Sequence, residues 1–174
     1  MKDPAYHHLG DHSESIQIDF DPNLISYEKL LEVFWSSHNP TQRPWSTQYK
    51  AAIFYHNEEQ KRLAIETRDR EAAKRNSRIM TEILPATEFY RAEAYHQKHR
   101  LRGESELMKE LQALYPGDED LVNSTAATRL NGYLDGYGSL ESLEKEFDNL
   151  GLPHEAGKKL IDRVKNRKRF LGVF

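Results

Sequence analysis

Strand-like segments occur only in the first hundred residues of this chain. Residues Ile16–Phe20 alternate apolar and polar side chains, and this period of two predicts a half-buried strand. A second run, Gln48–Tyr55, holds consecutive apolar residues that indicate burial on both faces. Residues Ile79–Leu84 predict the edge of a third strand. After Gly103 the composition changes and only helical patterns follow.

Helical spacing fills most of the remaining chain. Ser26 is placed to cap a helix, and Asn57 with Gln60 resembles a capping box that opens a charged helix to about Arg75. Ser139 is placed to open a later helix. The first helix carries an apolar face at helical spacing, made of Tyr27, Leu30, Leu31, Phe34 and Trp35. We therefore predict an α/β domain over residues 1–102 and an all-helical C-terminal extension over residues 103–174.

Cysteine is absent from all 174 residues. The chain therefore contains no disulfide, no thiolate metal site and no cysteine nucleophile. Any thiol chemistry would need a thiol from outside this sequence.

Charge and hydropathy exclude two further classes. The net charge of −3 argues against general nucleic-acid binding, and no run approaches the roughly 18 apolar residues that a membrane span needs. The first residues show no apolar signal-peptide core, so we expect a cytoplasmic protein. The basic end KNRKRF suits a helix C-terminus better than a nucleic-acid site, because it lacks interleaved aromatic residues.

A polar group precedes the first predicted strand. It brings together a carboxylate and several rings where a loop enters a strand, and such a place can hold a reaction site. The group consists of Tyr6, His7, His8, His12 and Glu14. The alternative, on these residues alone, is a solvated loop.

A second group of ring side chains occurs near residue 96. We expect a helix that carries Phe89, Tyr95, His96 and His99, with both histidines on one face. A metal ion would need a further ligand, and the sequence offers no obvious one. We therefore predict no metal site.

Linked short motifs of the first hundred residues resemble the peptide methionine sulfoxide reductase A family in order and spacing. The likeness covers about residues 4 to 99. The motifs are Pro4-Ala5-Tyr6, Asp11-His12-Ser13-Glu14, Ile16 to Pro22, ISYEKLLEVFW, SSHNPTQ, TQYKAAIFYH, EEQ and TEILPATEFYRAEAYHQ. The part after residue 103 looks like an extension carried by one branch of the family.

The resemblance implies a fold and a reaction. The family core is an α+β sandwich of ferredoxin-like type, and its members reduce the S-epimer of methionine sulfoxide, free or in proteins. A cysteine thiolate attacks the sulfur, methionine leaves behind a cysteine sulfenic acid, and thioredoxin or another thiol restores the enzyme. The family implies no bound cofactor, no nucleic acid and no membrane.

Three residues match family positions that bind the sulfoxide oxygen. Glu14 matches the family glutamate, which acts as the acid and must stay protonated to do so. Tyr6 and Tyr49 match tyrosines whose hydroxyls would donate to the same oxygen as it gains negative charge. The alternative for Tyr49 is a strand tyrosine that is simply half-buried.

The chain also departs from the family pattern. The family's Gly-Cys-Phe-Trp-Gly motif is not in this sequence, and the nucleophile and the methyl pocket that it forms are missing with it. An acidic residue of the family falls near Pro44 in a shortened loop, where this chain has none. The recycling cysteines are absent as well.

These departures leave three hypotheses. The favoured one is an N-terminally truncated form of an active reductase, inactive as it stands. The others are a non-catalytic module that binds methionine peptides, and an assembly module built on the helical extension. The favoured hypothesis predicts an incomplete core with an exposed apolar face on the first helix, and hence a chain prone to aggregate.

Overall fold

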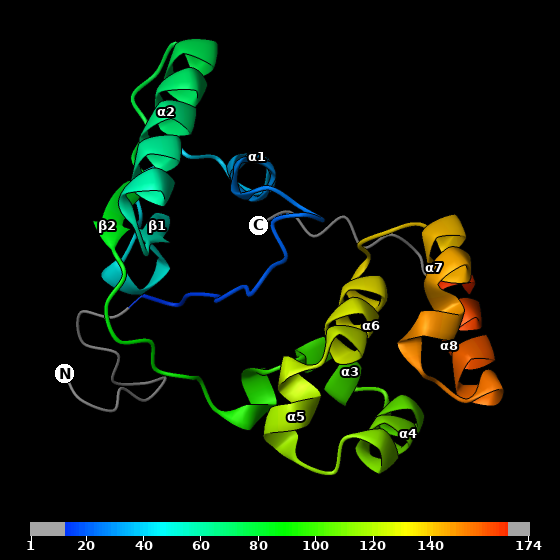
Figure 1. Cartoon of the computed structure of the whole chain (residues 1–174). Helices are drawn as coiled ribbons and strands as arrows, with labels where there is room; N and C mark the ends of the chain where they lie inside the picture. The colour runs from blue at the N-terminus through cyan, green and yellow to red at the C-terminus, as the bar shows by residue number, and fades with distance from the viewer. Residues whose placement is uncertain (1–12, 167–174) are drawn as a thin grey trace. The chain divides into compact units, whose positions relative to one another are not determined.

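The computed structural model describes residues 13–166 (Figure 1). They fall into two compact units, residues 13–91 and residues 92–166. The first unit holds a small parallel sheet with helices, and the second is helical throughout its described residues. This confirms the predicted class, a mixed α/β part followed by a helical part. The domain limits 1–102 and 103–174 stay a prediction.

The first unit is built around a strand, a helix and a second strand. Its elements are α1 (Tyr27–Ser36), the 3₁₀ turn η1 (Thr47–Tyr49), β1 (Ala52–Tyr55), α2 (Glu58–Arg75) and β2 (Glu82–Pro85). Strands β1 and β2 pair in parallel, with Ile53 opposite Ile83. A parallel pair requires a crossover connection, and α2 supplies it.

The helix ends of this unit follow their capping residues. The Ser26 hydroxyl accepts a hydrogen bond from the Lys29 amide at 3.2 Å, as predicted. Asn57 accepts from the Gln60 amide at 2.9 Å. Helix α2 ends at Asn76, whose left-handed backbone with φ 47° lets its amide reach the last carbonyls.

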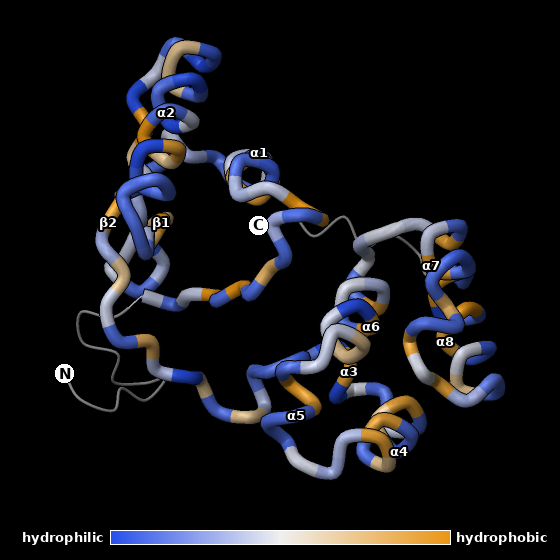
Figure 2. The backbone as a smooth tube through the Cα atoms, in the orientation of Figure 1, coloured by the Kyte–Doolittle hydropathy of each residue, from blue (hydrophilic) through white to orange (hydrophobic). Residues whose placement is uncertain are grey.

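One cluster of apolar side chains forms the core of the first unit. Its buried members are Leu31, Trp35, Ile53 and Ala64, with Tyr27, Phe34, Leu63, Ile79 and Ile83 packed around them. The prediction of an exposed apolar face on α1 is wrong, because α1 packs that face toward α2 and the sheet. The rest of α2 is hydrophilic (Figure 2) and bears ion pairs such as Arg62 with Glu66.

The predicted strand at Ile16–Phe20 is also wrong. The segment is extended but belongs to no sheet in residues 13–166. Ile16 is 85% exposed and Ile18 is 53% exposed, so the alternation buries neither residue. An alternating pattern yields a strand only where a neighbouring strand offers hydrogen bonds, and this segment has no such neighbour within the described chain.

Two further expectations need correction. Strand β1 is not buried on both faces, because Ile53 is buried while Phe54 is 37% exposed. Helix α2 packs against the two strands, and Ile53 lies in the same cluster as its Leu63 and Ala64, which explains why Ile53 is the buried residue. The helix expected over residues 89–99 is reduced to a 3₁₀ turn, η2 (Ala94–His96), and the start of α3. The positive φ of Lys98, 53°, interrupts helical geometry between them.

The second unit consists of short helices. They are α3 (His99–Arg102), α4 (Ser105–Leu114), α5 (Asp118–Asn123), α6 (Thr125–Asp135), α7 (Leu140–Glu146), η3 (Phe147–Leu150) and α8 (His154–Asn166). Leu101, Leu111, Leu130, Leu143 and Leu160 are fully buried in one core to which most of these helices contribute.

Polar contacts fix the turns between these helices. Ser139 caps α7 through the Ser142 amide at 3.1 Å, as predicted. The Asn131 side chain on α6 accepts from the Leu101 amide at 3.2 Å and so satisfies the start of α3. Arg102 pairs with Asp118 across the α4–α5 loop.

No helix within residues 13–166 is long and apolar enough to cross a membrane. The cytoplasmic location stays a prediction.

The packing of α8 predicts opposite effects for two glycine substitutions. A Cβ at Gly157 would fall on the ring of Phe147, whereas a Cβ at Gly132 on α6 meets nothing within 4 Å. We expect Gly157→Ala to lower the free energy of unfolding by about 1–3 kcal/mol through overpacking. Gly132→Ala, the matched control, should raise it by about 0.5–1 kcal/mol through helix propensity. Urea denaturation followed by circular dichroism measures both, and an unchanged Gly157→Ala would contradict the packing.

His38, at the end of α1, predicts a pH dependence of stability. Burial lowers the pKa of His38, the Phe34 carbonyl 2.9 Å from Nδ1 opposes this, and the charge of Arg75 adds to the lowering. Within residues 13–166, buried Nε2 has no hydrogen-bond partner, so a proton there is unfavourable.

A lowered pKa means that the unfolded chain binds the proton first as pH falls below about 6.5. We therefore expect the free energy of unfolding to fall between about pH 7 and pH 5, and His38→Asn to remove part of that slope. The ring signals of His38 should titrate below about 6.5 in NMR spectra. A midpoint above that value would contradict the assignment.

Candidate functional site

The candidate site residues lie on two segments of the first unit. Glu14 is on the extended segment before α1, and Tyr49 ends η1, just before β1. Tyr6, together with His7, His8 and His12, lies outside the described residues. Their proposed roles stay predictions.

Hydrogen bonds join these two segments although they are 34 residues apart. The Ser13 hydroxyl donates to the Thr47 carbonyl at 3.0 Å, and the Glu14 amide donates to the Gln48 carbonyl at 3.0 Å. Two consecutive residues of one segment are thus bonded to two consecutive residues of the other. The chain thereby brings Glu14 next to η1.

Gln48 connects the two candidate oxygen-binding groups directly. Its side-chain Nε2 donates to Glu14 Oε1 at 2.8 Å and to the Tyr49 hydroxyl oxygen at 3.3 Å. Glu14 and Tyr49 therefore share one neighbour, and both lie at the surface. A ligand can reach a carboxyl and a phenol hydroxyl here at once.

An aromatic wall stands beside this group. The ring of Trp45 stacks on Tyr49 with centroids 4.5 Å apart and an interplanar angle of 20°. Trp45 is 81% exposed and Tyr49 is 40% exposed, so the stacked pair projects from the protein. Apolar groups such as a thioether methyl can contact a ring of this kind.

Sequence reasoning missed Gln48 and Trp45. Gln48 was treated as the first residue of a strand, and nothing in its spacing shows that its amide faces a residue 34 positions earlier. Trp45 was placed in a polar loop. The available signal was the run Trp45 to Tyr49, in which two aromatic residues flank a polar segment.

The cation next to the site is already paired. Lys50 Nζ lies 2.8 Å from Glu82 Oε2 at the start of β2, and the lysine side chain is only 18% exposed. Its charge is thus directed to the sheet, while the side-chain amide of Gln48 donates to Glu14.

Metal ligation has no support in the part of the chain that the structure describes. Residues 13–166 contain no group of three His, Asp or Glu side chains placed to hold an ion. His96 Nε2 lies 4.0 Å from Glu93, and His99 Nδ1 lies 3.4 Å from the Tyr95 carbonyl.

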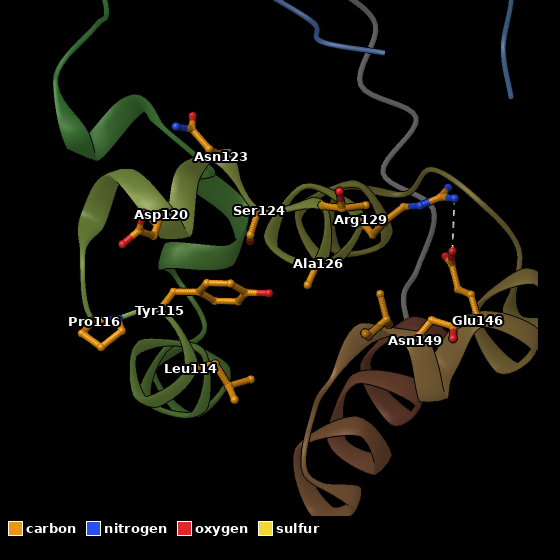
Figure 3. Close-up of a pocket in the computed structure, with 12 residues that line it drawn as sticks. Leu114, Tyr115, Pro116, Asp120, Asn123, Ser124, Ala126, Arg129, Glu146 and Asn149 are labelled. Carbon is orange, nitrogen blue, oxygen red and sulfur yellow. Dashed lines mark ion pairs between the residues drawn. The ribbon is translucent and has the colours of Figure 1, made fainter. Parts of the chain in front are cut away.

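The helical unit contains a separate open cavity of about 740 Å³ (Figure 3). Tyr115 and Leu114 contribute apolar surface to it. On the other side, Arg129 pairs with Glu146 at 3.2 Å. Glu146 also accepts a hydrogen bond from the Tyr133 hydroxyl. Desolvation, and to a smaller extent this hydrogen bond, raises the pKa of Tyr133. Arg129 and Glu146, two of the charged groups that line the cavity, are therefore paired with each other.

Comparison with known proteins assigns the chain to a family. The family model described as peptide methionine sulfoxide reductase matches residues 1–127. The chain belongs to the peptide methionine sulfoxide reductase family. A second model, described as the helical domain of selenoprotein methionine sulfoxide reductase A, matches residues 116–165. The helical unit is thus a known companion of this family.

Similar proteins occur in animals and plants. A peptide methionine sulfoxide reductase of Drosophila melanogaster is 43% identical over 151 residues, which cover 86% of this chain and 60% of the relative. Peptide methionine sulfoxide reductase A5 of Oryza sativa subsp. japonica is 43% identical over 136 residues, and that of Arabidopsis thaliana is 40% identical over 136. Both matches cover 75% of this chain and 53% of the relative. The chain thus spans between about half and three-fifths of these relatives.

Proposed function

We propose that this chain provides the sulfoxide-oxygen-binding side of a peptide methionine sulfoxide reductase. It would bind methionine sulfoxide, free or in proteins. The observation that carries the proposal is the hydrogen-bonded group of Glu14, Gln48 and Tyr49, with Trp45 stacked beside it. Family membership gives that group a chemical role.

The reaction needs two kinds of groups on the two atoms of the S–O bond. A thiolate attacks the sulfur while an acid protonates the oxygen, which yields a sulfenic acid and methionine. A second thiol then forms a disulfide and releases water. In total, one sulfoxide and two thiols give one thioether, one disulfide and one water.

Glu14 and Tyr49 suit the oxygen side of this reaction. In its protonated form Glu14 can pass a proton to the oxygen, and the Tyr49 hydroxyl can donate a hydrogen bond to it. Glu14 is exposed in the ligand-free chain. A bound sulfoxide with its methyl group against Trp45 would cover the carboxyl and favour its protonated form. Tyr6 would add a second hydroxyl.

The sulfur side needs a thiol that this sequence does not contain. Thioredoxin or another small thiol is the proposed reductant of the whole reaction. This chain by itself would bind the sulfoxide without turning it over.

A second candidate function is binding of unoxidised methionine peptides. The exposed Trp45–Tyr49 pair favours it, because a thioether contacts an aromatic ring without any need for an acid. Relative affinity for the oxidised and reduced forms distinguishes the two functions.

Binding of N-acetyl-methionine S-sulfoxide amide, measured by NMR titration, tests the proposal. We expect Tyr49→Phe to weaken sulfoxide binding about two- to tenfold, since it removes one hydrogen bond and keeps the ring. Glu14→Ala should weaken it similarly, and neither should affect the methionine analogue. Tyr137→Phe in the helical unit, where Tyr137 is 72% exposed, is the matched control. Equal affinity for both analogues would favour the second function.

A turnover assay tests the missing nucleophile. With dithiothreitol as the thiol, we expect the chain to form no methionine from the sulfoxide above the rate of the thiol alone, because hydroxyl side chains are poor nucleophiles without a positioned base. Chromatography of the products measures this. Turnover that Glu14→Gln abolishes would contradict this expectation and would mean that another nucleophile, a side chain or dithiothreitol itself, attacks the bound sulfoxide.

A further inference from the structure

Gln48 makes three hydrogen bonds to the two candidate oxygen-binding groups and their backbone. Its Nε2 donates to Glu14 Oε1 at 2.8 Å and to the Tyr49 hydroxyl oxygen at 3.3 Å. Its carbonyl accepts from the Glu14 amide at 3.0 Å. A primary amide has two hydrogens on one nitrogen, and here each points to a different candidate group.

The polarity of these bonds matters for the chemistry. Glu14 accepts the hydrogen bond of Gln48 at Oε1, and Gln48 makes no bond to the other carboxyl oxygen, Oε2. A protonated Glu14 would carry its hydrogen on Oε2. In its bond with Gln48, Tyr49 accepts through a lone pair of its oxygen. Gln48 therefore contacts both groups as a donor and takes a hydrogen from neither of them.

The position of Glu14 depends on such bonds. Its segment pairs with no strand in the described chain, and Glu14 itself is exposed, so packing does not hold it. Tyr49, in contrast, belongs to the 3₁₀ turn η1 and stacks on Trp45. Gln48 links the segment of Glu14 to this turn.

We propose that Gln48 is a positioning residue that holds Glu14 and Tyr49 in one arrangement around the sulfoxide oxygen. The proposal rests on the proposed function and extends it to a residue that does not itself donate to the substrate. Exposed side-chain hydrogen bonds add little stability, so the effect of Gln48 should be on geometry and not on folding.

Gln48→Met tests this role, because methionine has nearly the shape of glutamine and lacks the amide. Gln42→Met makes the same chemical change at an exposed position of the same loop and is the matched control. We expect Gln48→Met to weaken binding of the S-sulfoxide analogue about two- to tenfold, the worth of a hydrogen bond or two. Binding of the methionine analogue and the thermal unfolding midpoint should stay unchanged.

Two results would overturn the proposal. An equal loss of affinity for the sulfoxide and the methionine analogue would show that Gln48 only supports the local structure. An unchanged sulfoxide affinity would show that Glu14 and Tyr49 need no link. The difference between the two analogues is the readout that a purely structural role would not move.

An NMR measurement on the ligand-free chain separates this proposal from the proposed function. The side-chain amide signals of Gln48 should shift in both Glu14→Ala and Tyr49→Phe, while those of Gln42 should not. If wild type binds no sulfoxide but these shifts occur, the proposed function fails and the link itself stands. If the Gln48 side-chain signals shift in neither variant, the hydrogen bonds of Gln48 are absent and the proposal is overturned.

Discussion

The parallel pairing of β1 with β2 is the constraint on which the first unit depends. Parallel neighbours cannot be joined by a tight turn, so α2 must cross over the sheet, and its Leu63 and Ala64 then meet Ile53 and α1. This packing determines where β1 begins. Because η1 leads directly into β1, the same pairing places Gln48 and Tyr49 at one end of the sheet. The candidate site is thus a consequence of strand register.

The helical unit is held together in a different way, by a core shared among short helices. Its helices are short, and isolated helices of 4 to 13 residues have little stability in water. Their order comes from leucines that meet in one core and from contacts that tolerate no extra atom, such as Phe147 against Gly157. Charged groups lie around this core in pairs, for example Lys159 with Glu106 at 2.7 Å.

Local signals in the sequence predicted much of this architecture. Caps at Ser26, Asn57 and Ser139 marked helix starts correctly, because a cap is satisfied by residues three positions away. The prediction of a strand at Ile16–Phe20 is wrong because a strand forms only when two segments pair. The alternation within one segment does not show whether a partner segment exists.

The difference between local signals and contacts of distant segments also decides which parts of the candidate site could be predicted. Glu14 and Tyr49 could be chosen only by resemblance to a family, whereas the bonds of Gln48 to both needed the fold.

The chemistry of sulfoxide reduction explains how a sequence without a thiol can carry part of the proposed site. The nucleophile approaches sulfur and the acid approaches oxygen, so the two sets of groups touch different atoms and can be carried by different segments. Residues 13–91 bring together a carboxyl, a phenol and an exposed indole, and the proposed function assigns these groups to the oxygen and the methyl group of the substrate. In that proposal the groups on the oxygen side recognise the oxidised side chain, while the attack on sulfur requires a nucleophile from elsewhere. A binding preference for the sulfoxide therefore does not depend on a cysteine in this sequence.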